Sequence, residues 1–138
     1  MITAIDTNVL LDILIPNEIF RKSSSLALEE AATEGLLVIC GLVYAELCVH
    51  FNTQQECDRF LEDNGILVQS LNQASNFLAS RAWREYRKSG GKRDRILPDF
   101  LIGAHAQQQA TRLLSRDRGF YRAHFPALKV LKSSAHNH

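Results

Sequence analysis

The sequence has few cysteines, and they follow no metal-binding or disulfide pattern. Cys40, Cys48 and Cys57 are odd in number, form no CxxC pair and sit in apolar segments. This argues against a zinc site or a disulfide framework and favours reduced thiols in a cytoplasmic protein. Long hydrophobic runs are also missing, since no apolar stretch reaches the length of a membrane span. The chain opens MITAIDTN, without a basic lead or a long apolar segment. We therefore expect neither a signal peptide nor contact with a membrane.

What remains is the composition of an ordinary globular protein, 46% hydrophobic and 22% charged over 138 residues. That length is enough for one substantial core and too short for two. We therefore predict a single domain over residues 1–132, followed by a flexible tail over residues 133–138. No internal repeat or low-complexity segment divides the chain.

The net charge of +1 hides an uneven distribution. Residues 1–80 contain three basic and eleven acidic side chains, whereas residues 81–138 contain thirteen basic and four acidic ones. Basic charge gathered in one part of a fold is typical of a protein with a phosphate-rich partner. Two solvated faces of opposite sign would give the same counts, so charge alone does not decide the function.

Short apolar runs alternate with segments of helical character. The predicted strands are residues 2–5, 36–40, 66–70, 112–115 and 128–131. The predicted helices are residues 9–15 capped by Asn8, 24–34 ended by a left-handed Gly35, 42–51, the segment after the capping box at Thr53, 72–88, 98–110 and 118–122. Along the helix over 72–88 the apolar pattern predicts that Ala74, Phe77, Leu78, Ala82 and Tyr86 are buried. Strands separated by helices of this length indicate an α/β sandwich with a mostly parallel sheet.

Four acidic residues fall where such a sheet collects function, at the carboxyl ends of its strands. Asp6 ends the first strand, and Asp117 lies just past the fourth. Glu46 lies on the helix after the second strand, and Asp99 opens a helix that is otherwise apolar. Four converging acids would repel one another, and no lysine or arginine lies on the apolar stripes beside Glu46 and Asp99. A divalent cation is the natural counter-charge, and oxygen ligands without clustered Cys or His favour Mg²⁺ or Mn²⁺ over zinc.

Each acid also has a structural interpretation. Asp6 fits a turn or a helix cap, Asp99 a simple first-turn charge, and Glu46 a half-exposed position. Asp117 fits a surface ion-pair cluster with Arg116 and Arg118. The site hypothesis depends on the four acids meeting at one place.

Four stretches carry a resemblance to a known family. They are Ile5-Asp-Thr-Asn-Val-Leu-Leu-Asp12, Leu42-Val-Tyr-Ala-Glu-Leu47, Leu97-Pro-Asp-Phe-Leu-Ile-Gly-Ala-His105 and Leu114-Ser-Arg-Asp-Arg-Gly-Phe-Tyr121. Together, and in this order, they resemble the PIN-domain proteins, specifically the VapC-type toxins of bacterial toxin–antitoxin pairs. One departure is Cys40-Gly41, where the family usually has a Ser-Pro or similar capping pair.

The resemblance implies a fold, a site and partners. The fold would be a three-layer α/β/α sandwich with a five-stranded sheet in the order 3-2-1-4-5. Asp6, Glu46, Asp99 and Asp117 would bind Mg²⁺ or Mn²⁺, with Thr7 and Asn8 in support and Ser115 positioning the acids or a water. The partners would be RNA (structured RNAs such as tRNA are cut by relatives), a cognate antitoxin and a second copy in a homodimer.

We therefore predict a metal-dependent endoribonuclease acting as a toxin. Its RNA-binding residues would be Arg84, Arg87, Lys88, Lys92, Arg93, Arg95, Arg116, Arg118 and Arg122. The alternative is an RNA-binding module of the same fold that does not cut. Two other acid-rich folds lack support in the sequence. A response-regulator receiver needs a phospho-accepting Asp where the third strand ends Val68-Gln-Ser70. A haloacid-dehalogenase-type phosphatase needs Asp-x-Asp, and position 8 is Asn.

Overall fold

A computed structural model describes residues 1–16, 18–90 and 97–132. The predicted tail over residues 133–138 lies outside the described residues. The elements, in chain order, are β1 (Ile2–Ile5), α1 (Thr7–Leu14), α2 (Arg21–Glu34), β2 (Leu36–Cys40), α3 (Gly41–Cys48), α4 (Gln54–Asp63), β3 (Ile66–Gln69), α5 (Gln73–Lys88), α6 (Leu97–Gln109), β4 (Arg112–Ser115), α7 (Arg118–His124) and β5 (Val130–Lys132). Within the described part of the chain, none of the helices is long and apolar enough to span a bilayer.

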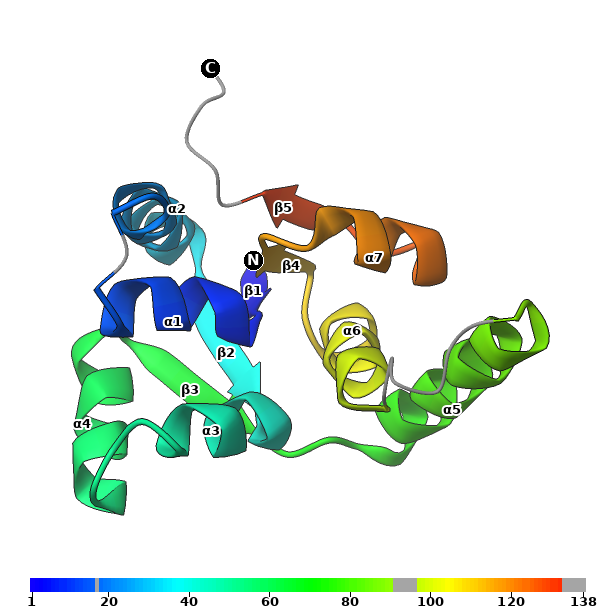
Figure 1. Cartoon of the computed structure of the whole chain (residues 1–138), viewed down its shortest axis with the longest axis horizontal. Helices are drawn as coiled ribbons and strands as arrows, with labels where there is room; N and C mark the ends of the chain where they lie inside the picture. The colour runs from blue at the N-terminus through cyan, green and yellow to red at the C-terminus, as the bar shows by residue number, and fades with distance from the viewer. Residues whose placement is uncertain (17, 91–96, 133–138) are drawn as a thin grey trace.

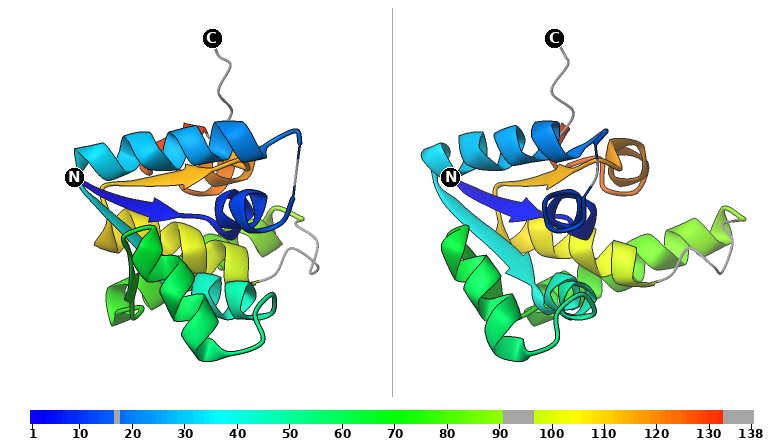
Figure 2. Two further views of the ribbon diagram at one scale, coloured as in Figure 1. Left: turned by 90° about the vertical axis from the view of Figure 1, so that its left-hand side faces the viewer. Right: turned by 60° about the vertical axis from the view of Figure 1, so that its left-hand side comes forward.

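The five strands form one parallel sheet in the order β3-β2-β1-β4-β5. The central strand β1 pairs on one side with β2, where Ala4 lies opposite Val38, and on the other with β4, where Ala4 lies opposite Leu113. Helices α1, α2 and α4 cover one face, and α5, α6 and α7 cover the other (Figures 1 and 2). The predicted α/β/α sandwich and its strand order are confirmed.

The core lies where the apolar strands meet α6. The strands are short, and most residues of the three central ones, β2, β1 and β4, are almost fully buried, as in parallel sheets covered on both faces. Helix α6 is buried at Phe100 and from Ile102 to Ala106, and it packs mainly along α5. The first turn of α6, which carries Asp99, is the less buried part of the helix. The apolar remainder of α6 anchors that turn at the surface.

Two predicted helix ends were wrong. Helix α1 begins at Thr7, and Asp6 caps it by accepting the Thr7 amide hydrogen, so Asp6 takes the cap position that we assigned to Asn8. Gly35 has φ 161°, which is extended and not left-handed. The glycine is needed for space, because a Cβ there would lie 1.9 Å from the Met1 carbonyl oxygen. That oxygen accepts the Leu36 amide hydrogen at 3.0 Å, so β2 begins against the first residue of the chain.

Two helix caps were predicted correctly, whereas the spacing of apolar residues along α5 predicted the wrong side chains to be buried. The capping box of Thr53 with Glu56 is present, and Asn72 caps α5 through the Ser75 amide. On α5, however, Ala74 is exposed and Phe77 is 59% exposed. The inner stripe instead contains Ser75 and Ala79, which are fully buried, so the prediction for Ala74 and Phe77 was wrong.

Several other element boundaries also differ from the prediction. Helix α2 begins at Arg21, three residues earlier than predicted, and α7 ends at His124, two residues later. Strand β5 begins at Val130, two residues later than predicted, because Val130 pairs with Leu113 of β4. Helix α3 ends at Cys48, three residues before the predicted end of that helix.

Gly103 allows α6 to lie against a buried aromatic ring. A Cβ at this position would come within 2.5 Å of the ring of Phe125, which is 1% exposed. We expect Gly103→Ala to lower the free energy of unfolding by about 1–2 kcal/mol, because overpacking outweighs the gain in helix propensity. Gly41→Ala, at the start of α3, is the matched control, since no heavy atom lies within 4 Å of its added Cβ. Urea denaturation of both variants measures the difference, and an unchanged midpoint for Gly103→Ala would show that the ring yields freely.

Candidate metal and active site

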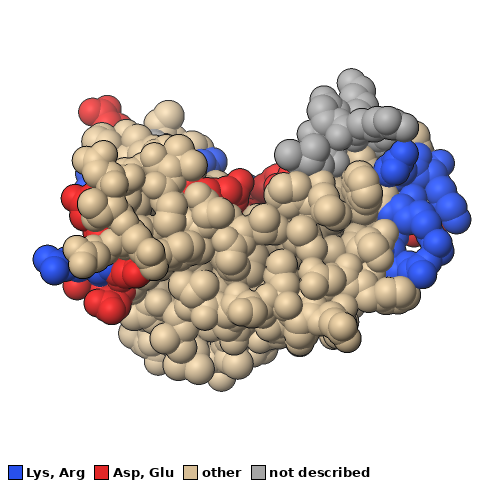
Figure 3. All heavy atoms as spheres, turned by 90° about the horizontal axis from the view of Figure 1, so that it is seen from below, with Lys and Arg blue, Asp and Glu red and all other residues tan. Residues whose placement is uncertain are grey.

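The four predicted acids follow the carboxyl ends of their strands or open a helix beside them. Asp6 caps α1 directly after β1, and Asp117 stands at the N-cap position of α7, just after β4. Glu46 lies on α3, after β2, and Asp99 lies in the first turn of α6. In Figure 3, acidic side chains lie in the hollow along the upper edge of the view.

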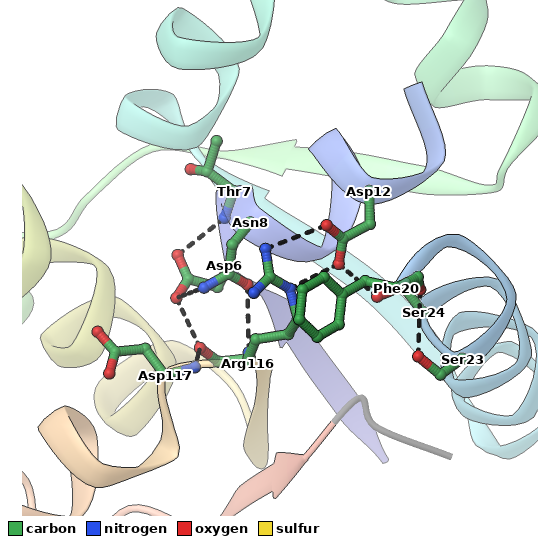
Figure 4. Close-up of polar contacts among 10 residues, drawn as sticks. Asp6, Thr7, Asn8, Asp12, Phe20, Ser23, Ser24, Arg116 and Asp117 are labelled. Atoms are coloured by element: carbon green, nitrogen blue, oxygen red, sulfur yellow. Dashed lines mark hydrogen bonds and ion pairs between the residues drawn. The ribbon is translucent and has the colours of Figure 1, made fainter. Parts of the chain in front are cut away.

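Asp6 is the centre of the hydrogen-bond network at this edge (Figure 4). It is 6% exposed. Its Oδ1 accepts the Thr7 amide hydrogen at 2.8 Å, and its Oδ2 accepts the Ser115 hydroxyl at 2.7 Å. The Asn8 side-chain amide donates to the same Oδ2 at 3.4 Å. The carboxylate is therefore oriented from both α1 and β4.

The pKa of Asp6 shows that its negative charge is costly in this structure. The pKa of Asp6 is raised to about 6, chiefly by burial and to a smaller extent by the negative charge of Asp99. Hydrogen bonds from Ser115, from Tyr121 and from the Thr7 amide act in the opposite direction and favour the carboxylate. A buried acid beside a second acid is the environment in which a cation would be stabilising.

Tyr121 is a site residue that the prediction missed. It is 1% exposed, and its hydroxyl is hydrogen-bonded to Asp6. Burial raises the pKa of Tyr121, and the charges of Asp6, Asp99 and Asp117 raise it further. The phenol therefore stays protonated and can donate, and three of the four predicted acids lie close enough to act on one ring. The sequence offered one signal for this role, because Tyr121 lies only four residues after Asp117, on α7.

Thr7 also contacts Glu46, the acid on α3. The Thr7 hydroxyl donates to Glu46 Oε1 at 2.5 Å, which links α1 to α3. Glu46 is itself exposed, so this bond fixes its orientation without burying its charge. This hydrogen bond is the contact through which Thr7 would support the site, as predicted.

Ser115 connects two of the acids. Its hydroxyl donates to Asp6, as described, and the same oxygen accepts the Asp117 amide hydrogen at 2.9 Å. Ser115 itself is fully buried. The Asn8 side-chain oxygen accepts the Arg116 amide hydrogen at 3.2 Å, so Asn8 also holds the segment that carries Asp117.

A buried ion pair, also missed, fixes the same segment from behind. Asp12 of α1 has a side chain that is 2% exposed, and Arg116 donates to it through Nε at 2.7 Å and Nη2 at 3.1 Å. Ser24 of α2 donates to the same carboxylate at 2.7 Å, and the Arg116 guanidinium lies 4.0 Å from the centre of the Phe20 ring. Figure 4 shows α1, α2 and the segment after β4 joined at this point. The guanidinium of Arg116, predicted to bind RNA, is thus engaged within the fold.

We expect Arg116→Gln to lower the free energy of unfolding by about 2 kcal/mol. The change leaves the Asp12 carboxylate buried without its cation, and the partial exposure of Arg116 places the cost below that of a fully buried pair. Asp12→Asn, alone and combined with Arg116→Gln, completes a double-mutant cycle measured by urea denaturation. Arg118→Gln, two residues away, serves as the matched control. A coupling energy near zero would mean that the two side chains do not stabilise one another.

The donor set fits a hard cation. The four acids, Ser115 and Thr7 offer only oxygen atoms, which Mg²⁺ and Mn²⁺ prefer. Within the described ranges no three His, Cys, Asp or Glu side chains are arranged so that together they could hold a metal ion. Mg²⁺ usually binds through one or two carboxylates and completes its shell with waters and phosphate oxygens. The pair Asp6 and Asp99 meets that requirement.

The predicted RNA-binding residues lie in two groups. Arg84, Arg87 and Lys88 are exposed near the end of α5, where basic side chains gather at one side of Figure 3. Arg118 and Arg122 lie on α7, beside Asp117. Lys92, Arg93 and Arg95 lie outside the described residues.

Comparison with models of known protein families gives a match to one family. Residues 3–126 match the sequence model of the family described as PIN domain. None of the curated proteins compared with the chain matches it significantly.

Several solved structures share the fold at low sequence identity. A chain of VapBC2 from Rickettsia felis, bound to a fragment of its promoter DNA, superposes with a TM-score of 0.73 at 21% identity, covering 96% of this chain and 98% of that one. A chain of VapBC-1 from nontypeable Haemophilus influenzae gives 0.71 at 17%, with the same coverage. A chain of FitAcB from Neisseria gonorrhoeae gives 0.68 at 19%, again covering 96% and 98%.

Proposed function

Since the chain belongs to the PIN-domain family, we propose that it is a Mg²⁺- or Mn²⁺-dependent endoribonuclease that hydrolyses RNA phosphodiester bonds. The observation that carries the proposal is the environment of Asp6. This carboxylate is buried, it accepts hydrogen bonds from Thr7 and Ser115, and the negative charge of Asp99 raises its pKa. Such an arrangement is costly as a purely structural feature, and it suits a cation that interacts with phosphate.

Asp6 and Asp99 would hold the ion, with Glu46 and Asp117 completing the acidic site. When bound, Mg²⁺ or Mn²⁺ supplies positive charge that stabilises phosphate oxygens and makes an attacking water more acidic. Ser115 and Tyr121 keep the Asp6 carboxylate oriented, and Thr7 does the same for Glu46. Attack by water would leave 5′-phosphate and 3′-hydroxyl ends, so the ribose 2′-hydroxyl takes no part.

The basic side chains on α5 and α7 would hold the RNA backbone. Arg84, Arg87 and Lys88 carry positive charge on α5, and Arg118 and Arg122 carry it on α7, which follows Asp117. Binding of this kind weakens as salt concentration rises, because counterions are released from the phosphates. Unpaired or looped RNA is the favoured substrate class, since sequence-specific readers usually need unstacked bases.

We further propose that the protein is the toxin of a toxin–antitoxin pair. The support is the likeness of the fold to chains of VapBC and FitAB complexes. The proposed partners are a cognate antitoxin, which would silence the nuclease, and a second copy of the chain in a homodimer. A short reading frame for a DNA-binding antitoxin directly upstream would support this role. Its absence would count against the toxin role without touching the nuclease.

Purified protein incubated with single-stranded RNA and Mn²⁺ or Mg²⁺ tests the enzymatic proposal. We expect internal cleavage with 5′-phosphate ends, and its loss in EDTA with recovery when the metal is restored. Cleavage that persists in EDTA and leaves 2′,3′-cyclic phosphates would contradict the mechanism. Binding of RNA without cleavage under any divalent ion would favour the non-catalytic RNA-binding module.

A further inference from the structure

The C-terminal half of α5 carries a basic and aromatic depression away from the acidic site. Ser80, Trp83, Arg84, Arg87 and Lys88 line it, and it encloses about 510 Å³. We refer to these five residues as the α5 platform. In Figure 3 basic side chains gather at the right-hand end of the molecule, where α5 lies, apart from the acidic side chains in the hollow.

Trp83 gives the platform an aromatic surface with an unused donor. It is the single tryptophan of the chain, and the guanidinium of Arg87 lies 5.1 Å from the centre of its ring. Its indole N–H is buried and has no hydrogen-bond partner, the one such side-chain atom found in the described residues. Tryptophan usually satisfies this donor when it is buried. The buried nitrogen is out of reach of a ligand, so Trp83 contributes its ring to the depression and not this donor.

The charge of the platform selects its ligand. Helix α5 carries four arginines and lysines from Arg81 onward and one acid, Glu85. The exposed Arg84 and Lys88 are placed to contact phosphates, while Trp83 and Arg87 offer flat surfaces for a base. Stacking surfaces interleaved with basic side chains are the elements of single-strand recognition. A protein partner of ordinary composition would leave this positive charge uncompensated.

We propose that the α5 platform binds an unpaired nucleotide of the RNA substrate, with the base stacked on the Trp83–Arg87 pair and the flanking phosphates at Arg84 and Lys88. This deepens the proposed ribonuclease function and rests on it for the identity of the ligand. Stacking of one base on an aromatic side chain is worth about ten- to a hundredfold in affinity. The platform therefore acts on RNA binding, at a distance from the acids that act on the bond.

Because Trp83 is the only tryptophan, its fluorescence reports on the platform directly. The full chain in EDTA, which prevents cleavage, is titrated with a ten-nucleotide oligoadenylate and with an abasic RNA chain of the same phosphate count. Anisotropy of labelled RNA measures binding independently. We expect saturable quenching by oligoadenylate at the dissociation constant given by anisotropy, and binding at least tenfold weaker, without quenching, for the abasic chain. Oligoadenylate binding that leaves the emission unchanged would overturn the proposal.

Variants separate the phosphate contacts from general charge. Arg84→Gln combined with Lys88→Gln should reduce the slope of log affinity against log salt by about 1.4, at about 0.7 for each lost contact to a single strand. Arg81→Gln is the matched control, because Arg81 lies over Phe77, 4.5 Å from its ring centre and outside the depression. Equal slopes for the double variant and the control would overturn the assignment. So would an emission change that follows protein concentration without RNA, since a second copy would then cover Trp83.

The two proposals fail separately. Quenching by RNA in a protein that never cleaves would leave the platform in place and remove the nuclease. Metal-dependent cleavage without quenching would keep the nuclease and remove the platform.

Discussion

Asp99→Asn is expected to reduce RNA cleavage on the order of a hundred- to a thousandfold, the usual cost of removing one charge-stabilising group from a preorganised site. Asparagine keeps the shape of the side chain at the start of α6, so substrate can still reach the site. The change removes one of the two negative charges whose repulsion raises the pKa of Asp6. With a weaker hold on the metal, the reaction loses charge stabilisation while RNA affinity at the basic residues is retained.

The folded state should tolerate this substitution. The first turn of α6 loses a favourable interaction with the helix dipole, about 0.3–1 kcal/mol, and gains relief from the charge of Asp6. Initial rates at saturating RNA and metal, with circular dichroism on the same samples, separate activity from folding. Asp63→Asn, the same exchange at an exposed position at the end of α4, is the control. An Asp99→Asn protein that cleaves at the wild-type rate would remove Asp99 from the site.

The places of the four acids in the fold could be predicted from the sequence. Asp6, Asp99 and Asp117 lie where a strand ends or a helix begins, and Glu46 interrupts the apolar residues of α3. The strand order came only from the family resemblance, because the residues of β1 do not indicate which strands pair with it. Asp12 shows the limit of the approach. An acid in an apolar helix needs a partner, and the reasoning applied to Asp99 holds equally for Asp12. The partner is Arg116, 104 residues away in sequence, and only the tertiary fold brings the two together.

The spacing of apolar residues predicted burial least accurately on α5, which has one face packed on the core and another with a proposed function. On α5 the pattern placed Phe77 inside, yet Phe77 is exposed under Arg81. Small residues, Ser75 and Ala79, take the inner positions because α5 packs closely along α6. Hydrophobicity alone would bury Phe77 rather than Ser75. The close approach of the two helices leaves room only for the smaller side chain, so Ser75 is buried and Phe77 is exposed. Gly35 is a comparable case. A glycine is needed there because of Met1, which is distant in the sequence but lies beside Gly35 where β1 and β2 begin.

Asp6→Asn is expected to stabilise the metal-free protein at neutral pH while abolishing its response to metal. Asp6 has a pKa of about 6 in the folded chain against the ordinary 3.8. Between those values the folded state holds the proton that the unfolded chain has lost. The wild-type free energy of unfolding therefore falls as pH rises from about 4 to about 6 and is level above that, with a total loss of about 3 kcal/mol. Asparagine has no such titration.

The net gain at pH 7.5 should be about 2 kcal/mol, because the single amide oxygen of asparagine cannot replace both acceptor contacts to Thr7 and Ser115, at about 1 kcal/mol for the lost bond. Urea denaturation in EDTA at pH 4 and at pH 7.5 measures the difference between the two proteins, in which the titration of every other group cancels. A difference that is the same at both pH values would mean that Asp6 ionises as an exposed acid does. Mn²⁺ at about a hundred times its dissociation constant should then raise the wild type by about 2.7 kcal/mol and the variant much less. The order of stability would reverse, because the charge that weakens the metal-free fold is the one that holds the ion.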